Sequence, residues 1–194
     1  MRKKERLEKR RARMQKDLSC YGSRILNSEE MRQAFRQKHH TLSTVGAHTM
    51  RVARKSLAIC YALEKLHIDT DIPAVVAASL CHDIGILGRD EKYGSDKECS
   101  RRHSADSVGV AQKLMGELPE KTTDMISRHM WPAGRSKAPN SLEAAIVSAA
   151  DKSAAVEDFI AGYKEKRPGI RGVVRELKNR KRERDSGLRR SKEK

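Results

Sequence analysis

The chain has 194 residues, 35% of them charged, and its formal net charge at pH 7 is +16. That length suits one domain with a sizeable core and is marginal for two. The sequence contains no run of about 18 apolar residues, so it predicts no membrane-spanning helix.

The positive charge lies at the two ends of the chain. Residues 1–16 carry nine Lys or Arg and two Glu, and residues 164–194 carry fourteen Lys or Arg and five acidic residues. These ends account for the whole net charge, so the region between them is balanced. We therefore expect a basic N-terminal tail at 1–20, a folded domain at 21–163 and a basic C-terminal tail at 164–194.

Helical periodicity recurs along the central region, whereas the alternation typical of strands is nearly absent. A first helix is expected over about 28–38, where Ser28 and Glu30 stand close to the positions of a capping box. A second helix is expected over about 42–66, and its apolar stripe also contains His48.

The next apolar stripe runs from Ile72 and ends in a carboxylate, Asp83, before a break at Gly85 and Gly88. The polar segment 86–102 that follows is interpreted as a loop with at most a short helical turn.

Three more segments complete the domain. A helix over about 103–118 should stop before Pro119, and another is expected over about 120–130. The segment 132–140 is a loop, and the last helix begins after Ser141, a plausible N-cap, and continues to about residue 163.

Several ionisable residues fall on the apolar faces of these helices, where a charge is costly unless it is paired or bound to a metal. A single histidine in such a place is more often a hydrogen-bonded core residue, and a lone aspartate near a helix end is more often a cap or a salt bridge. An ordered set spread over separate helices is a much more specific signal. The set comprises His48, His82, Asp83, His103, His129 and Asp151.

The residue types narrow the chemistry. Imidazoles and carboxylates without thiolates suit Fe, Mn, Ni, Co or Zn in a catalytic site. The four cysteines form no CxxC pair, and Cys60 and Cys81 lie in apolar runs, so we expect reduced core thiols in a cytoplasmic protein.

Three segments resemble the signature segments of the HD superfamily of metal-dependent phosphohydrolases. They are Ala47-His48-Thr49-Met50-Arg51-Val52-Ala53, Leu80-Cys81-His82-Asp83-Ile84-Gly85 and Ala149-Ala150-Asp151-Lys152. The resemblance covers about 40–160. It implies an all-α bundle of at least five helices that holds one or two divalent transition metal ions, with His48, His82, Asp83 and Asp151 as ligands.

Two further segments refine the resemblance. Those around His103 and His129 are similar to HD proteins that hold two or more metals, and Ser127-Arg128-His129-Met130-Trp131-Pro132 is similar to a group of short bacterial HD proteins. The resemblance implies that Asp83 bridges two metals and that His103 and His129 bind the second. His40 also matches a histidine of that group, and we expect it to orient a ligand.

The sequence departs from the family pattern at two points. Ile86 stands where many HD proteins have lysine, and there is no GYP segment, which removes the main support for a cyclic di-guanylate phosphodiesterase. A phosphate-binding cation must then come from elsewhere. Lys152 is the first choice and Arg102, Arg128 and Arg89 are the alternatives, although a single charge at such positions is more often a solvated surface residue.

The resulting hypothesis is hydrolysis of a nucleotide or other small phosphoester by metal-activated water, with Asp83 and Lys152 as catalytic residues. The loops 86–102 and 132–140 would select the substrate. The alternative is a nucleic-acid-binding protein in which the HD domain is structural or regulatory and the basic tails bind RNA or DNA. Neither hypothesis involves a membrane.

Overall fold

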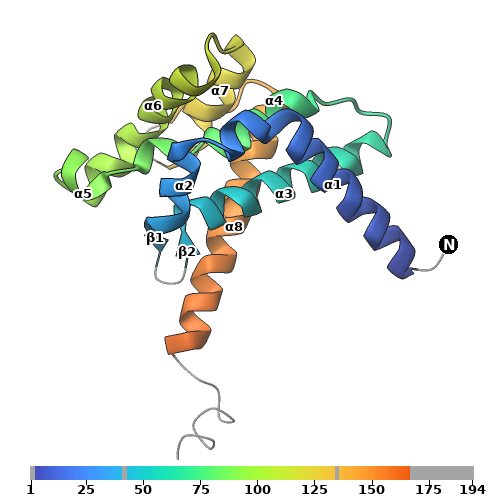
Figure 1. Cartoon of the computed structure of the whole chain (residues 1–194), viewed down its shortest axis with the longest axis horizontal. Helices are drawn as coiled ribbons and strands as arrows, with labels where there is room; N and C mark the ends of the chain where they lie inside the picture. The colour runs from blue at the N-terminus through green and yellow to red at the C-terminus, as the bar shows by residue number, and fades with distance from the viewer. Residues whose placement is uncertain (1–2, 41–42, 134–135, 167–194) are drawn as a thin grey trace, which may run out of the picture. The chain divides into compact units, whose positions relative to one another are not determined.

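The computed structural model describes residues 3–40, 43–133 and 136–166 (Figure 1). Its elements in chain order are α1 (Lys3–Leu26), α2 (Glu29–Arg36), β1 (Lys38–His40), β2 (Ser43–Thr44), α3 (Val45–Glu64), α4 (Ile72–Cys81), the 3-10 helix η1 (Ile84–Ile86), α5 (Arg89–Lys92), α6 (Asp96–Met115), α7 (Glu120–Arg128) and α8 (Leu142–Lys166). Residues 1–157 form one compact unit, and the described part of a second unit, 158–166, lies within α8.

The predicted all-α fold is confirmed. Within the described ranges, the strands are confined to β1 and β2, which pair as one short antiparallel hairpin. The predicted helix starts at Ser28 and Ser141 are also correct, because each hydroxyl accepts a hydrogen bond from a backbone N–H three residues later.

Helix α4 lies at the centre of the first unit. Its residues 74–81 are all buried, and α1, α3 and α7 pack against it. A helix that is apolar on every side can only be stable when it is covered on every side. The residues that directly follow α4, His82 and Asp83, are therefore delivered to the interior, where they are 0% and 3% exposed.

The N-terminal region is more ordered than its charge indicates. Residues 3–26 form one helix, α1, so the boundary expected at residue 20 falls inside it. Leu18 and Ile25 are buried, and Met14 packs against the same core. Most of the predicted C-terminal tail, from residue 167 on, lies outside the described residues.

The prediction of a loop over 86–102 was wrong in its second half. Helix α6 begins at Asp96, because Ser95 caps it by accepting from the backbone N–H of Glu98 at 3.2 Å. The Glu98 side chain in turn accepts from the N–H of Gly94 at 3.0 Å, which resembles a capping box shifted by one residue. The helix also ends before the predicted residue 118, since Gly116 adopts a positive φ of 86°.

Two further expectations concern membrane-spanning helices and the state of the cysteine thiols. None of the helices in the described part is long and apolar enough to cross a membrane. Cys60 and Cys81 are free, buried thiols, as the sequence predicted. Burial raises the pKa of the Cys81 thiol to about 12, so it behaves as an inert core group.

Candidate metal centre

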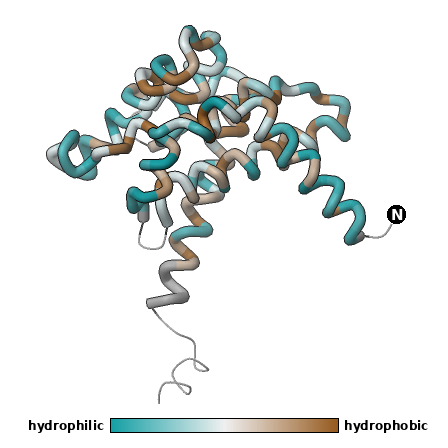
Figure 2. Tube along the Cα trace, in the orientation of Figure 1, coloured by the Kyte–Doolittle hydropathy of each residue, from teal (hydrophilic) through white to brown (hydrophobic). Residues whose placement is uncertain are grey.

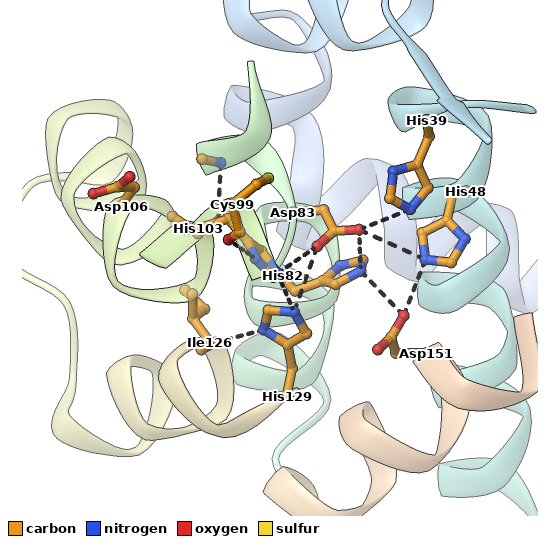
Figure 3. Close-up of polar contacts among 12 residues, drawn as sticks. His39, His48, His82, Asp83, Cys99, His103, Asp106, Ile126, His129 and Asp151 are labelled. Atoms are coloured by element: carbon orange, nitrogen blue, oxygen red, sulfur yellow. Dashed lines mark hydrogen bonds and ion pairs between the residues drawn. The ribbon is translucent and has the colours of Figure 1, made fainter. Parts of the chain in front are cut away.

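The structure brings together all six side chains that the sequence singled out (Figure 3). His48 lies in α3, and His82 and Asp83 directly follow α4. His103 lies in α6, His129 caps the end of α7 and Asp151 lies in α8. None of the six side chains belongs to a residue that is more than 7% exposed.

The carboxylate of Asp83 stands in the middle of the cluster. Its Oδ2 lies 3.2 Å from Nε2 of His82 and 3.7 Å from Nε2 of His48. Its Oδ1 lies 3.4 Å from Nε2 of His103 and 3.4 Å from Nε2 of His129. The two oxygens of one carboxylate thus face two different pairs of imidazoles.

This arrangement divides the cluster into two groups that share Asp83. The first adds His48, His82 and Asp151, with Oδ1 of Asp151 at 3.0 Å from Nε2 of His48 and 3.8 Å from Nε2 of His82. The second adds His103 and His129. In each group the potential ligand atoms lie within 4.8 Å of one another, so each could hold a metal ion.

Backbone carbonyls fix the orientation of three of the imidazoles. Nδ1 of His82 lies 2.8 Å from the carbonyl oxygen of Ser79, and Nδ1 of His103 lies 2.8 Å from that of Cys99. Nδ1 of His129 lies 2.7 Å from the carbonyl oxygen of Ile126. Because a carbonyl can only accept, these Nδ1 atoms carry the proton, and the Nε2 atoms of the neutral rings present lone pairs to the cluster.

Those lone pairs meet other electron-rich atoms. The Nε2 atoms of His103 and His129 are 3.1 Å apart. The buried Nε2 of His82 has no hydrogen bond within the described residues, although it lies 3.2 Å from Asp83. Lone pairs that converge in this way repel one another unless a cation lies between them. The donor set therefore fits divalent metal ions better than it fits an ordinary polar core.

The electrostatics agree with this interpretation. Burial alone would lower the pKa of His82, but the carboxylates of Asp83 and Asp151 outweigh it and raise that pKa to about 9. Without a metal, this ring therefore takes up a second proton near neutral pH, and a bound metal ion would displace that proton from Nε2. Burial would raise the pKa of Asp83, but the surrounding imidazoles hold it well below its usual range. Burial lowers the pKa of His129. The carboxylates thus create a field that attracts positive charge into the centre.

A glycine lets α6 approach the centre. A Cβ atom on Gly85 would lie 2.4 Å from the carbonyl oxygen of His103 and 2.4 Å from the backbone nitrogen of Ser107. The Gly85 N–H instead donates to Oγ of Ser107 at 2.9 Å. This close contact between η1 and α6 places His103 beside Asp83, which explains the glycine at the break predicted after Asp83.

The centre opens into a cavity of about 480 Å³. Its walls include residues from both loops that were expected to select the substrate, Arg89 from one and Ala133 from the other. Lys152 also lines it and donates to Oδ2 of Asp151 at 2.8 Å and to the carbonyl of His129 at 2.6 Å.

Of the four candidate phosphate-binding cations, Lys152 and Arg89 thus reach the cavity. The other two, Arg102 and Arg128, do not line it, and they pair with Glu98 and Asp124 respectively.

One neighbour of the centre was not predicted. Nε2 of His39, in β1, lies 3.4 Å from Oδ2 of Asp83, and its ring centroid is 4.6 Å from that of His48. His40, the histidine that was expected to orient a ligand, has a side chain that lies outside the described residues. The sequence does show two adjacent histidines, His39 and His40, but it does not indicate which of the two side chains faces the metal centre.

Comparison with known proteins completes the assignment. No curated protein and no solved structure matches the chain. The HD domain family, by contrast, matches residues 45–156, more than half of the chain and the whole span of the six clustered side chains. The chain therefore belongs to the HD domain family, whose members are generally metal-dependent hydrolases.

Proposed function

We propose that this protein hydrolyses a small phosphoester, such as a nucleotide, at a centre of two divalent metal ions. The observation that carries the proposal is the position of Asp83, whose two oxygens face His48 and His82 on one side and His103 and His129 on the other. A carboxylate that bridges two metals needs such an arrangement.

Each residue has a defined role in this proposal. His48, His82 and Asp151 complete one metal site with Asp83, and His103 with His129 completes the other. Metals held there would supply an activated water and neutralise the negative charge of the phosphate. The protein contributes the fixed direction of the imidazoles, through their carbonyl partners, and an interior that excludes bulk water from the ligands.

The walls of the cavity indicate what it accepts. Lys152 and Arg89 lie in the cavity wall beside the ligands, where Lys152 pairs with Asp151 and Arg89 pairs with Asp96. Their remaining N–H groups suit the oxygens of a phosphate. Ile86, Met130 and Ala155 add apolar surface, which suits an organic group attached to that phosphate. We infer a substrate with one phosphoryl group at the metals and a partly apolar remainder, as in a nucleotide.

The alternative hypothesis is a nucleic-acid-binding protein in which the HD domain has the same fold but no hydrolase activity. If the domain were only structural, no selection would maintain six buried ligands, since each buried ionisable group costs stability when it lacks a metal. The intact ligand set in one cluster supports the enzyme. Metal analysis separates the two hypotheses, because a structural domain would contain no stoichiometric metal.

The test uses the full chain, purified without chelators. Its metal content is measured, and hydrolysis of nucleotides and generic phosphomonoesters and diesters is assayed with Mn, Fe, Ni or Mg. We expect roughly two metal equivalents and turnover of at least one substrate class. Asp83→Asn should lower activity by more than the roughly 10–100-fold typical of residues that only orient ligands.

The matched control is Asp69→Asn, which removes the same charge from an exposed position outside the cluster. It should leave both metal content and activity unchanged. A chain that binds no metal and turns over none of the substrates would overturn the proposal, as would equal activity in the Asp83 and Asp69 variants.

A further inference from the structure

A second cavity lies between α1 and the C-terminal part of α3, and it shares no lining residue with the cavity at the metal centre. Its volume is about 510 Å³. We call it the α1/α3 groove. It is lined by five cations, one carboxylate and four other residues, which are Arg6, Leu7, Lys9, Arg10, Arg13, Ala58, Tyr61, Ala62, Glu64 and Lys65.

Four of the cations form a row on one face of α1. Arg6, Lys9, Arg10 and Arg13 are spaced by three, one and three residues, so successive helical turns bring them to the same side. With a rise of about 1.5 Å per residue, the row extends over roughly 10 Å. Figure 2 shows the hydrophilic character of these first turns, next to the N label.

Carboxylates of the protein pair with two of these four cations. Lys9 pairs with Glu5 at 3.0 Å. Arg13 is engaged, since its guanidinium pairs with Glu64 at 2.6 Å and covers the ring of Tyr61 at 4.2 Å. Within the part of the chain that is described, no carboxylate pairs with Arg6 or Arg10. Arg10 makes one long hydrogen bond of 3.4 Å to the carbonyl of Ala58.

Folding does not require such a row. Like charges four residues apart on a helix, as in Arg6 with Arg10 and Lys9 with Arg13, destabilise the helix. The Glu5–Lys9 and Arg13–Asp17 pairs offset the cost for Lys9 and Arg13, whereas no such pair offsets it for Arg6 and Arg10 in the described part of the chain. Met14, Leu18 and Ile25 already hold α1 on the core through a neighbouring face. Arg6 and Arg10 thus line the cavity without a carboxylate partner among the described residues, and a ligand that brings negative charge would supply one.

We propose that the α1/α3 groove binds the phosphate backbone of a nucleic-acid strand. An extended row of cations suits a polymer with one charge per repeat better than it suits a single phosphate. Guanidinium groups bind phosphate oxygens through paired hydrogen bonds. Tyr61 is only 5% exposed and lies under Arg13, so it offers no open ring for a base. Binding is therefore independent of base sequence.

The test measures binding of the full chain to a fluorescent 20-nucleotide single-stranded RNA at several salt concentrations. The variant Arg6→Ala/Arg10→Ala removes two charges from the groove. The control variant Lys4→Ala/Arg11→Ala removes two charges from the opposite side of the same helix, so net charge and helix propensity change equally.

We expect the groove variant to bind about 10-fold more weakly at low salt, and the slope of log K against log salt to fall by about 1.4, or roughly 0.7 for each lost phosphate contact. The control should lose less than about 2-fold, because long-range attraction alone depends on net charge. Lys65→Ala, on the α3 wall, should lose affinity in the same sense.

Three results would overturn the proposal. These are equal losses in the groove and control variants, no RNA binding by the full chain, and tighter binding of polyglutamate than of RNA. The groove variant should keep the metal content and small-substrate activity of the unmodified chain. A failure of the groove proposal can thereby be told apart from a failure of the proposed hydrolase activity.

Discussion

His103 and His129 turn their Nε2 atoms toward each other at 3.1 Å, while the Nδ1 atom of each ring is engaged by a backbone carbonyl. Oδ1 of Asp83 lies 3.4 Å from both Nε2 atoms. Three electron-rich atoms thus converge on one point, and a cation at that point would relieve their repulsion. This second group of ligands can be tested separately from the first.

We predict that His129→Ala removes one metal and leaves the other. Bound metal should fall from roughly two equivalents to roughly one, and hydrolysis should be largely lost. Metal analysis of the dialysed protein measures the change. The control is His67→Asn, which removes an exposed histidine and keeps a residue type that tolerates its positive φ of 58°. Retention of both metals by His129→Ala would show that the centre holds its metals without this ring.

A second prediction concerns the contact between η1 and α6. Gly85→Ala would place a Cβ atom 2.4 Å from backbone atoms of α6, so that helix must shift. The expected cost is about 1–3 kcal/mol in the free energy of unfolding, together with weaker binding of the second metal. Denaturant unfolding and metal titration measure the two effects.

The control for this change lies in α6 itself. A Cβ atom on Gly109 has no neighbour within 4 Å among the atoms around it, so Gly109→Ala should stabilise the protein by about 0.5–1 kcal/mol. If both alanine variants changed stability by the same amount and in the same direction, the close approach at Gly85 would not matter.

A third prediction separates the candidate phosphate-binding cations. Arg89→Ala should raise KM for a phosphoester by about 10-fold with a smaller change in kcat, because the side chain lines the cavity and is not one of the proposed metal ligands. Arg102→Ala removes the same charge from a side chain that pairs with Glu98 away from the cavity, and it should leave both constants unchanged. Equal effects would mean that only the overall charge matters.

The fourth prediction concerns pH. Glu143 is buried, which by itself would raise its pKa, but hydrogen bonds from Lys121 Nζ at 2.6 Å and from the backbone N–H of Asp71 at 3.1 Å lower that pKa below its ordinary value. A lowered pKa in the folded state means that this carboxylate stabilises the protein above its unfolded pKa of about 4.3. The contribution is lost as the pH falls through the folded value.

Glu143→Gln should therefore destabilise the protein by about 1 kcal/mol at pH 7, since Lys121 is partly exposed and the pair is screened by solvent. Thermal unfolding of both proteins between pH 7 and pH 4 measures the difference. The gap in Tm should stay constant at higher pH and narrow below about pH 4.3. A gap that widened in acid would contradict the assigned sign.

The sequence predicted the six clustered residues because they form an ordered set of costly ionisable groups over several helices and lie in segments that resemble those of the HD family, whereas any one of them alone would be typical of a core residue or a cap. It did not predict His39, because the hairpin over 38–44 has no periodicity that tells inward from outward residues. The early start of α6 was not predicted, because the polar composition of 86–102 is typical of a loop, although Ser95 and Glu98 stand at capping positions. The buried face of α1 was not predicted, because Met14, Leu18 and Ile25 are dispersed among charged residues.

The carbonyls that orient His82, His103 and His129 belong to residues three or four positions earlier in the chain, in the helix that contains the histidine or ends directly before it. Each helix therefore carries its own means of aiming its ligand, and no neighbouring helix has to supply a partner. We therefore expect that substitutions in the cavity walls and loops leave the direction of these three imidazoles unchanged. A designer could likewise transplant single turns, such as Cys99–His103, onto other bundles and retain the direction of the imidazole.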